Sequence, residues 1–437
     1  MPLMFSWTAP RDKRAPATAS TEGRRRVFIS AGELSGDIAG AALTVEIRRR
    51  DPTVHVFGTG GPHMAEAGAD IAGSTNRIGV VGITEALATI PSVLQVCRDI
   101  ARSIRETRPD VAVLIGNDVF NVVLARWLRR RGVPTVSYFP PQAWIWRSLA
   151  RPIARSFDAV LATFPEEYEV YARARERTEV TFTGHYLADR LAPATDADRQ
   201  AARRALGLPA GDRVVALLPG SRPHELRSLS AVMWDSAAQL LARDPMLRFV
   251  VPVADAGRVA AVTRELASRP IASRTCVCRD SHTAMRSANL AILASGTASL
   301  EAALLGIPMI IVYRVSAITH VIVRAAIRLG LIKSYTVGLP NLVLGRGVVP
   351  EVLQQRVTWP VLADQAWTLL SDPAALERMH DELVDMAARL RRGQAVETTA
   401  DAVLAWADAG RRRQRAAGAI AGAVAVPAGT LDTPDAK

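Results

Sequence analysis

Short runs of apolar residues alternate with longer amphipathic stretches along most of this chain, and each run ends in polar or glycine-containing sequence. The amphipathic stretches have the spacing of helices, whereas most of the runs are apolar at nearly every position. Strands of that kind are typical of a parallel sheet that helices cover on both sides. In the first half of the chain the predicted strands are Arg26–Ser30, Val54–Phe57, Asp110–Ile115, Thr135–Tyr138, Asp158–Ala162 and Val180–Thr183.

A polar, alanine-rich stretch, Ala192–Arg203, and the sequence LPAGD at Leu208–Asp212 separate this series from a second one. The same pattern then returns, which predicts an α/β protein with two Rossmann-like domains facing a central cleft. The predicted strands of the second series are Arg213–Leu218, Arg248–Pro252, Thr275–Cys278, Asn289–Ala294 and Pro308–Tyr313. The predicted division is a disordered basic N-terminus at 1–24, an N-terminal domain at 25–190, a C-terminal domain at 191–365, C-terminal helices at 366–410 and a basic disordered tail at 411–437.

Lysine and arginine outnumber aspartate and glutamate by 54 to 42 among the 437 residues, which gives a net charge of +12. A basic balance of this size favours nucleic acid, anionic lipid headgroups or phosphorylated substrates as partners, and charge alone does not separate them. No apolar run reaches the ~18–20 residues that span a bilayer, and the N-terminal residues carry charges where an export signal has an apolar core. We therefore expect a cytoplasmic protein whose contact with a membrane is peripheral.

The residue types that bind metals are few and scattered. The three cysteines, Cys97, Cys276 and Cys278, have no ligand cluster near them in the sequence. Neither they nor the histidines show a metal-ligand spacing, so we expect no metal site and no disulfide. His185, at the joint between the two predicted domains, is expected to be structural.

The first predicted strand leads into the sequence AGELSGD at residues 31–37. Glycines after a strand let the backbone approach a ligand, and the helix that follows offers its first amides. The spacing is not that of a dinucleotide-binding fingerprint, and a turn in which Ser35 or Asp37 caps the helix is the competing explanation. The candidate cleft residues at this turn are Gly32, Glu33, Ser35, Gly36 and Asp37.

In the second half, two predicted strands end in loops suited to phosphate. LPGSR follows the first strand and SGT follows the fourth, each directly before a helix. Helix capping explains either loop taken alone, but two such loops at strand ends of one domain predict a site for a nucleotide diphosphate. The candidate donor-binding residues are Gly220, Ser221, Arg222 and Glu225 at the first loop, and Ser295, Gly296, Thr297 and Glu301 at the second.

A carboxylate after a strand in the first half is the candidate general base. Asp118 follows the strand that ends at Ile115, where it could accept a proton from an attacking hydroxyl; a turn or helix-capping aspartate is the alternative.

Two further segments stand out by composition. IGVVGITEALATIPSVL, at residues 78–94, is apolar at helical spacing and is expected either in the core or against acyl chains or a membrane. The loop at 138–147 carries two tryptophans and an arginine, which suit a sugar face, a lipid interface or a domain joint.

In their order and spacing, these segments resemble the lipid-A-disaccharide synthase family, which has the GT-B glycosyltransferase fold. The resemblance runs from about Val27 to Gln354. It is carried by AGELSGDIAGA, GVVGITEAL, the Trp-Ile-Trp-Arg loop, GHYLAD, LPGSRPHE, ASGTASLEAALLGIP and LPNLVLGRGVVPE.

This resemblance implies a reaction in lipid A biosynthesis. UDP-2,3-diacylglucosamine donates its sugar, with inversion, to 2,3-diacylglucosamine 1-phosphate, and the products are a β-1,6-linked disaccharide and UDP. The UDP-sugar is a substrate, and neither a cofactor nor a metal is expected. The resemblance also implies a peripheral place on the anionic inner membrane surface, C-terminal helices that pack back on the N-terminal domain, a homodimer, and no nucleic-acid partner.

The resemblance also assigns roles to residues. It implies that Arg222 neutralises the diphosphate, assisted by the SGT turn, Glu301, Asn341 and Glu351. It places Asn121, Trp144, Trp146 and Arg147 at the acceptor side of the cleft. It implies that Val80, Val81, Ile83, Leu87 and Ile90 contact the membrane or acyl chains.

One segment departs from the family pattern. The family sequence I-D-x-P-D-F-N has its first aspartate implicated in catalysis, whereas this chain has glycine there, Gly116, and carries Asp118 two residues later. The family's S-P-S-V-W-A-W-R is PPQAWIWR here. Both changes lie beside the acceptor site, while the UDP-side motifs are intact. Three alternatives therefore compete with a synthase. They are a related glycosyltransferase with another lipid or glycan acceptor, a catalytically silent UDP-sugar or lipid-binding protein, and a sugar-nucleotide epimerase of the same fold.

Overall fold

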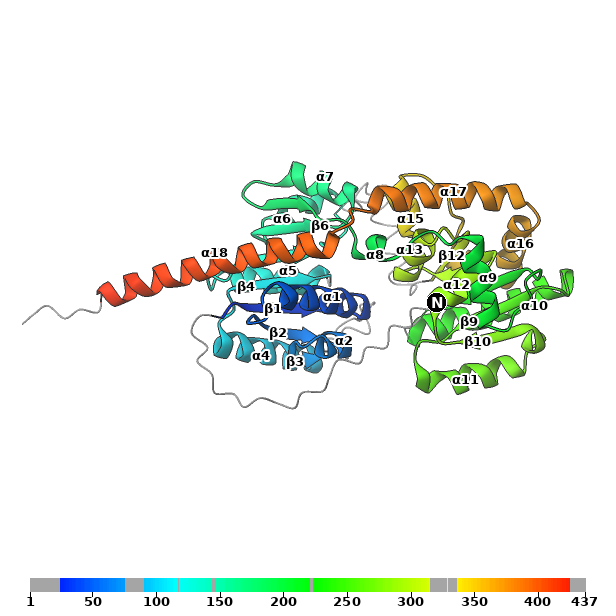
Figure 1. Ribbon diagram of the computed structural model, residues 1–437, viewed down its shortest axis with the longest axis horizontal. Helices are drawn as coiled ribbons and strands as arrows, with labels where there is room; N and C mark the ends of the chain where they lie inside the picture. The colour runs from blue at the N-terminus through cyan, green and yellow to red at the C-terminus, as the bar shows by residue number, and fades with distance from the viewer. Residues whose placement is uncertain are drawn as a thin grey trace, which may run out of the picture.

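The computed structural model describes residues 24–74, 90–116, 118–143, 147–220, 223–314, 328 and 336–424, and two parallel β-sheets form its two domains (Figure 1). The N-terminal sheet contains, in spatial order, β3 (Asp70–Ser74), β2 (His55–Gly60), β1 (Arg26–Ala31), β4 (Val111–Ile115), β5 (Thr135–Tyr138), β6 (Ala159–Ala162) and β7 (Glu179–Phe182). The C-terminal sheet contains β10 (Thr275–Cys278), β9 (Arg248–Pro252), β8 (Val214–Leu218), β11 (Leu290–Ala294), β12 (Met309–Tyr313) and β13 (Glu351–Leu353). This architecture confirms the predicted α/β class with two Rossmann-like domains.

The predicted strands all form, with ends shifted by a few residues. Two short edge strands, β3 and β13, were not predicted. The sequence of β3, DIAGS, and the three residues of β13 are too short and too polar to stand out from their surroundings. Both are held by a neighbouring strand, β2 and β12 respectively, so tertiary pairing decides their conformation.

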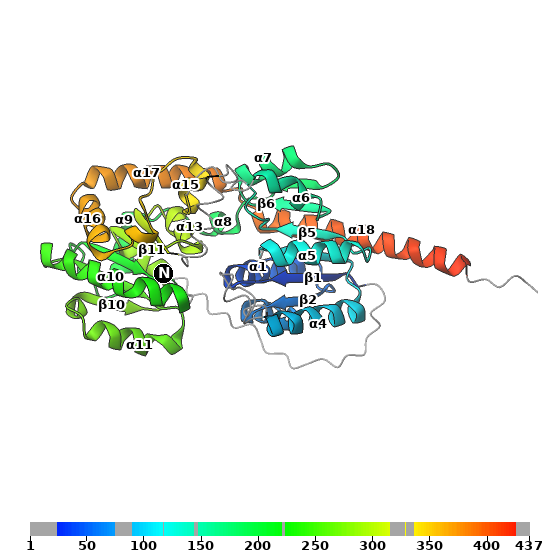
Figure 2. The same cartoon turned by 180° about the vertical axis from the view of Figure 1, so that it is seen from behind.

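Helices cover both faces of each sheet. Those of the N-terminal domain are α1 (Leu34–Arg50), α2 (Pro62–Glu66), α4 (Ile90–Thr107), α5 (Asp118–Arg129), α6 (Ala150–Ala154), α7 (Pro165–Ala174) and α8 (Tyr186–Arg190), with a 3₁₀ turn, η2, at Arg147–Leu149. Those of the C-terminal domain are α9 (Asp196–Ala205), α10 (Pro223–Arg243), α11 (Ala256–Ala267), α12 (Ser281–Ser287), α13 (Thr297–Leu304), α15 (Leu339–Leu344), α16 (Trp359–Leu370) and α17 (Pro373–Leu390), with 3₁₀ turns η3 (Ala272–Arg274) and η4 (Gln354–Arg356). Figure 2 shows α4 and α5 together on one face of the N-terminal sheet.

The last helix, α18 (Ala395–Val424), returns from the C-terminal domain and packs on the N-terminal domain against α1 (Figure 1). This confirms that C-terminal helices pack back on the N-terminal domain. The prediction of a disordered tail from residue 411 was wrong in part, because α18 continues through Val424. Gln414 explains some of this order, since its side chain donates to the Pro109 carbonyl at 2.9 Å and accepts from Arg26 at 3.1 Å.

Backbone contact also fixes α18 in place. At Gly410 the helix approaches the start of β4 so closely that a Cβ atom would collide with the carbonyl oxygen of Asp110. Arg25 adds a two-pronged pair with Asp408, at 2.8 and 3.0 Å. The helix is therefore an integral layer of the N-terminal domain. No helix in the described part of the chain is long and apolar enough to cross a membrane.

The two chain crossings between the domains are fastened to each other. The first crossing contains α8 and the second joins α17 to α18. The Asp189 carboxylate on α8 accepts hydrogen bonds from the backbone amides of Arg392, Gly393 and Ala395, at 3.0, 2.7 and 2.7 Å. The Arg391 guanidinium donates in the opposite direction, to the carbonyls of Ala188 and Leu191. This clamp fixes where the chain leaves one domain and enters the other.

Replacing Asp189 with alanine removes the acceptor that caps the start of α18. We expect Asp189→Ala to lower the free energy of unfolding by about 1–2 kcal/mol, because three backbone amides lose a charged acceptor. Urea unfolding followed by circular dichroism measures the change. Asp364→Ala is the matched control: this carboxylate is 64% exposed and pairs across the surface with Arg243, so we expect a change within about 0.5 kcal/mol. Equal losses in the two variants would contradict the clamp.

Candidate functional site

The order of the strands reverses once in each sheet, and the candidate loops lie at these reversals. In the N-terminal sheet the order changes direction between β1 and β4, and in the C-terminal sheet between β8 and β11. Two adjacent loops leave the carboxyl edge of the sheet toward opposite faces at such a point, and a crevice opens between them. The register pairs Ala31 with Ile115 in the first sheet and Leu218 with Leu293 in the second. The turns predicted to bind ligands therefore leave neighbouring strand ends.

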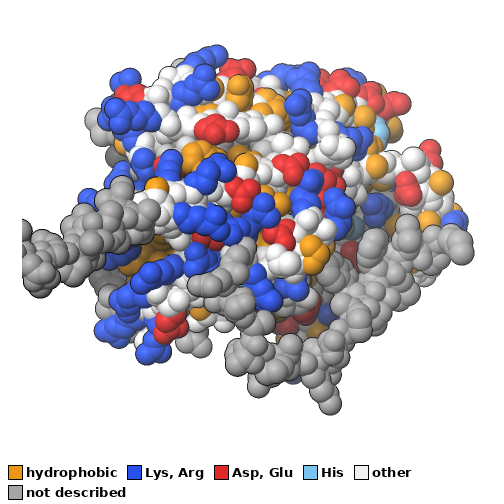
Figure 3. All heavy atoms as spheres, turned by 60° about the vertical axis from the view of Figure 1, so that its left-hand side comes forward, with side chains coloured by type: hydrophobic (Ala, Val, Ile, Leu, Met, Phe, Trp, Pro, Cys, Tyr) orange, Lys and Arg blue, Asp and Glu red, His pale blue; other side chains and the backbone are white. Residues whose placement is uncertain are grey.

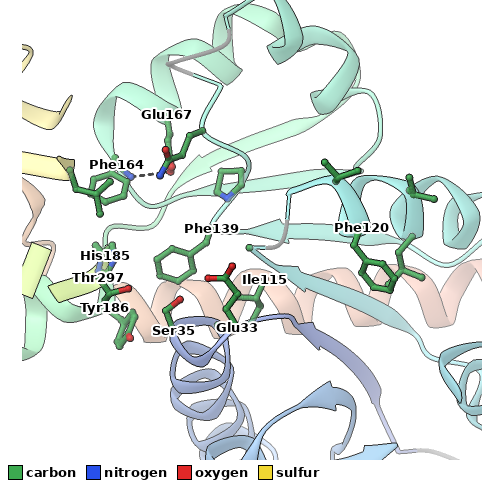
Figure 4. Close-up of a pocket in the computed structure, with 18 of the residues that line it drawn as sticks. Glu33, Ser35, Ile115, Phe120, Phe139, Phe164, Glu167, His185, Tyr186 and Thr297 are labelled. Atoms are coloured by element: carbon green, nitrogen blue, oxygen red, sulfur yellow. Dashed lines mark hydrogen bonds between the residues drawn. The ribbon is translucent and has the colours of Figure 1, made fainter. Parts of the chain in front are cut away.

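A cavity of about 1090 Å³ lies where the two domains meet (Figure 4). From the N-terminal domain its lining includes Glu33, Ser35, Gly116 and Phe139, and from the C-terminal domain Thr297 and Leu300. The two reversal points therefore contribute to one shared space. This volume is slightly above the roughly 300–1,000 Å³ that is usual for small-molecule pockets.

The β1–α1 turn, which was predicted to lie in the cleft, lines the N-terminal side of this cavity. Glu33, Ser35 and Gly36 line it, as predicted for cleft residues, and Figure 4 shows the Glu33 and Ser35 side chains side by side. Asp37 is buried elsewhere: its carboxylate accepts from the backbone amides of Gly61, His63 and Met64, at 2.7, 3.0 and 3.1 Å.

Asp37 therefore holds the start of α2. The competing prediction that Asp37 caps its own helix was also wrong, because the N-cap of α1 is Glu33, which makes no side-chain cap bond. Gly32 precedes Glu33 in the turn and is not among the residues that line the cavity.

The β4–α5 turn is shaped by Asn121. The buried amide of Asn121 donates to the carbonyls of Gly116 and Ile115, at 2.5 and 3.2 Å, and its oxygen accepts from Ser30 at 3.0 Å. Asn121 therefore fixes the backbone of the turn that carries Gly116, which lines the cavity. Asp118 is the first residue of α5, but its side chain lies outside the described part of the structure, so its catalytic role stays a prediction.

Aromatic rings form the wall of the cavity next to the domain joint (Figure 4). Phe139, Phe164, His185 and Tyr186 line it, and the Phe139 ring meets His185 edge-on, with 5.0 Å between centroids. Phe139 has a φ of 54°, a conformation that costs a bulky residue free energy and is retained where the surroundings fix it. Pro140 and Gln142 continue this wall. Trp144 and Trp146 lie outside the described residues, as does the side chain of Arg147.

His185 is neutral in the folded protein. Its Nδ1 accepts from the Leu187 amide at 3.1 Å, so Nε2 carries the proton. Burial lowers the pKa of His185 from 6.5 to about 3, because the charged ring cannot be solvated among Phe139, Phe164 and Tyr186. The residue was expected to be structural; it caps α8 and also lines the cavity.

In the C-terminal domain, the first of the two loops predicted to bind a donor follows β8. Gly220 has a φ of 105°, and a Cβ atom there would collide with Glu225, so glycine is required for this loop to fold back over its helix. Ser221 and Arg222 lie outside the described residues, and their predicted contacts with a diphosphate stay predictions.

The second loop predicted to bind a donor follows β11. The Ser295 hydroxyl donates to the Val337 carbonyl at 3.0 Å, Gly296 precedes α13, and Thr297 begins this helix and lines the cavity. Glu301 lies in the second turn of α13. Its carboxylate is 3.3 Å from Nε2 of His282 on α12, with both side chains partly buried.

Two predicted donor residues hold the loops beside this site. The Asn341 amide oxygen accepts from the amides of Val348 and Val349, both at 2.8 Å, and its nitrogen donates to the Val349 carbonyl and to Glu351. Glu351 accepts in turn from the amides of Val337 and Gly338. In this conformation the two side chains connect three segments of protein, and direct contact with a donor stays a prediction.

Some predictions lie beyond what the structure describes. Val80, Val81, Ile83 and Leu87 are outside the described residues, and only the backbone of Ile90, at the start of α4, is described. Among the residues that are described, no group of three or more histidine, cysteine, aspartate or glutamate side chains could hold a metal ion.

The cavity also contains residues that sequence reasoning did not single out, chiefly Phe139, Phe164 and Glu167. Glu167 caps α7 by accepting from Thr163 and Phe164, at 2.9 and 3.3 Å, and its motif, T-x-x-x-E, is readable as a helix start. The aromatic residues follow strands in the same way as the motif residues do. Their position after a strand end was the available signal.

Two Rossmann-like domains with their carboxyl edges on one shared cavity define this protein as one with the GT-B fold. The chain belongs to the lipid-A-disaccharide synthase family. The lipid-A-disaccharide synthetase family model matches residues 27–404. A lipid-A-disaccharide synthase of Pseudomonas paraeruginosa is 38% identical over 383 residues, which cover 87% of this chain and 98% of the relative. The synthase of Geobacter sulfurreducens is 37% identical over 381 residues, 87% of this chain and 96% of the relative.

Solved structures share the fold at low sequence identity. UDP-GlcNAc 2-epimerase from Neisseria meningitidis, bound to UDP-GlcNAc, aligns with a TM-score of 0.58 and 14% identity, over 87% of this chain and 99% of its own. The glycosyltransferase of kitacinnamycin aligns with a TM-score of 0.56 and 15% identity, over 88% and 99%. These structures support the GT-B fold. The sequence relatives favour the synthase over an epimerase, a glycosyltransferase with another acceptor, or a silent binding protein.

The pKa of His185 makes stability depend on pH. The unfolded state takes up a proton near pH 6.5 that the folded state refuses until about pH 3, so this contribution is complete above pH 6.5 and is lost as the pH falls. One such group lowers the free energy of unfolding by about 1.4 kcal/mol between pH 7.5 and pH 5.5. In His185→Asn the amide oxygen keeps the cap of α8 and does not titrate. We expect this variant to lack that part of the pH dependence in urea unfolding; an unchanged dependence would contradict the assignment.

Proposed function

We propose that this protein is a lipid-A-disaccharide synthase that transfers 2,3-diacylglucosamine from its UDP derivative to 2,3-diacylglucosamine 1-phosphate. The transfer inverts the anomeric carbon and forms a β-1,6 linkage, with UDP as the second product. The observation that carries the proposal is the shared cavity, lined by the turns after β1, β4 and β11, within a chain that matches the synthase family over nearly its whole length. A carbohydrate held there has a nucleotide-type site on one side and a carboxylate on the other.

The donor half of the mechanism follows from the C-terminal loops. The helices α10 and α13 begin at neighbouring strand ends, and helix N-termini attract a diphosphate through their backbone amides and dipoles. As UDP departs, negative charge grows on its diphosphate, and these groups stabilise it in place. We assign the fixed positive charge there to Arg222.

The acceptor half needs a group that takes the proton from the attacking 6-hydroxyl. The sequence analysis predicts Asp118. Glu33 is a second candidate, because its carboxylate lines the cavity from the β1 edge, one strand away from Gly116. Glu167, the other carboxylate among the cavity-lining residues, already accepts several hydrogen bonds within its own turn. An in-line attack from the N-terminal side then inverts the sugar carbon.

The test supplies purified protein with UDP-2,3-diacylglucosamine and 2,3-diacylglucosamine 1-phosphate and measures products by mass spectrometry. We expect equal amounts of disaccharide and UDP. Release of UDP without disaccharide would contradict the proposed acceptor, and an absence of turnover would contradict an active synthase.

Two variants then identify the base. Removal of a general base lowers kcat by about 10²–10⁴-fold and leaves donor binding nearly unchanged. We expect that loss in only one of Asp118→Asn and Glu33→Gln, together with loss of the acidic limb of the pH–rate profile. Asp99→Asn on α4 is the control carboxylate, since it accepts a hydrogen bond from Gln95 of the same helix at 3.0 Å and does not line the cavity. Equal, near-normal kcat in both test variants would place the base elsewhere.

We also propose that the protein works as a peripheral protein on the anionic inner membrane surface and needs neither metal nor cofactor. Arginine side chains are frequent on the face shown in Figure 3, and Arg412, Arg413 and Arg415 extend along exposed positions of α18. Positive charges of this kind attract anionic headgroups, and salt screens the attraction. A homodimer remains part of the proposal on the strength of the family resemblance.

Chelation tests the absence of a metal. The proposed mechanism neutralises the diphosphate with arginine and helix amides, so treatment with EDTA followed by gel filtration is expected to leave kcat within about twofold of the untreated value. Loss of activity that Mg²⁺ restores would contradict this part of the mechanism.

A further inference from the structure

The shared cavity continues away from the domain joint along the N-terminal domain. On α4 it is lined by Cys97, Ile100 and Ala101, and on α5 by Val119, Val123 and Trp127. We call this part the α4–α5 trench. Both helices lie on the same face of the sheet (Figure 2), and Phe120 and Leu124 of α5 line the same cavity. The trench is apolar and opens into the cleft at Glu33, Ser35 and Gly116.

Helix α5 has one polar face and one apolar face. Arg126 donates to Ser156, and Arg129 pairs with Asp158, so both arginines are directed toward the α6 side. The stripe along the trench consists of Val119, Val123 and Trp127, which follow one another at four-residue intervals on one face of the helix. Val119 is 79% exposed and Val123 is 60% exposed. Water-facing apolar side chains that line a cavity indicate an apolar ligand.

The length of the trench suits an acyl chain better than a sugar ring. Val119 and Trp127 are eight residues apart in the helix, which corresponds to about 12 Å along its axis. With C–C bonds of about 1.5 Å, an extended acyl chain advances about 1.3 Å per carbon, so roughly nine carbons fit between these two residues.

Trp127 is held at the far end by the turn that follows its helix. The guanidinium carbon of Arg131 lies 3.7 Å from the centroid of the Trp127 ring, and Arg131 also donates to the Trp127 carbonyl at 3.3 Å. A stacked arginine restricts the ring and covers one of its faces. The indole therefore stands at the end of the trench, where the tip of a longer acyl chain would contact it.

We infer that the α4–α5 trench holds one acyl chain of the acceptor and that Trp127 sets the length of chain it accepts. The inference rests on the proposed function and deepens it. The acceptor is the occupant because the trench opens beside Glu33 on the N-terminal side, whereas the nucleotide of the donor is assigned to the C-terminal loops. The sugar stays in the cleft and the chain leaves it between α4 and α5.

The experiment measures kcat/KM for acceptors whose acyl chains differ by two carbons, with the donor fixed, and then repeats the series with the donor varied. Each methylene group of the acyl chain that becomes buried in the trench, or is no longer buried there, changes kcat/KM by about fourfold. We expect Trp127→Ala to shift the preferred acceptor chain to a longer one and Val123→Trp to shift it to a shorter one. Neither variant should change the preference for the donor chain.

Two controls separate a local effect from damage to the fold. Val123 is exposed, so the added indole of Val123→Trp should leave thermal unfolding unchanged. Trp359→Ala removes a tryptophan that is 43% exposed at the start of α16 in the other domain, and we expect its chain preference to match the unmodified protein.

Cys97 provides a readout that does not require turnover. Its thiol is exposed and lines the trench, whereas Cys276 and Cys278 belong to the C-terminal sheet. The acceptor alone, without donor, is expected to slow alkylation of Cys97 about tenfold or more, measured on its peptide by mass spectrometry. A short-chain acceptor should give less protection, and Cys276 and Cys278 should be unaffected.

The outcomes distinguish the inference from the function on which it rests. If the protein makes no disaccharide, the proposed function fails. If it makes disaccharide while both trench variants keep the normal chain preference and Cys97 is not protected, the inference fails. Weaker binding of Trp127→Ala to anionic phospholipid vesicles, with unchanged chain preference, would overturn the inference in favour of a bilayer-docking face.

Discussion

The direction of the strands is the constraint on which the site depends. Every strand pair in the two sheets is parallel, and each sheet reverses its order once, at β1–β4 and at β8–β11. Each reversal separates two helices to opposite faces and leaves a crevice at the carboxyl edge. Residues of both domains line one cavity, and this cavity borders α8, which Asp189 and Arg391 fasten to the α17–α18 connection. The turns after β1, β4 and β11 then line one shared space.

Some of the motif residues hold the loops in place, and others line the cavity. Asp37, Asn121, Asn341 and Glu351 all occupy motif positions, and all use their polar atoms to hold loops near the cavity. Removing such a residue would move the loop and the ligand-binding atoms that the loop presents. Glu33, Ser35 and Thr297 line the cavity itself. A motif therefore contains both kinds of residue, and only the partners of each side chain tell them apart.

The sequence predicted the elements that local pattern determines. Apolar runs identified the central strands, and glycine-containing turns after them identified the loops that face the cavity. The roles of single residues were harder to predict. Asp37, for example, accepts hydrogen bonds from backbone amides that follow it in the sequence by 24 to 27 positions. The α4–α5 trench was also hidden: Val119, Val123 and Trp127 form an ordinary amphipathic pattern, and only their exposure beside the cavity distinguishes them from core residues. The helix beyond residue 410 was missed because arginine-rich composition resembles a tail, while Gly410 and Gln414 fix it to the domain.

Hydrogen–deuterium exchange with and without UDP tests the central claim most directly. The account predicts slower exchange of the backbone amides at 219–225 and 295–301, the turns after β8 and β11, with no change in the edge strands β3 and β10. Protection confined to other segments, or spread evenly over both sheets, would contradict a nucleotide site at the reversal point of the C-terminal sheet.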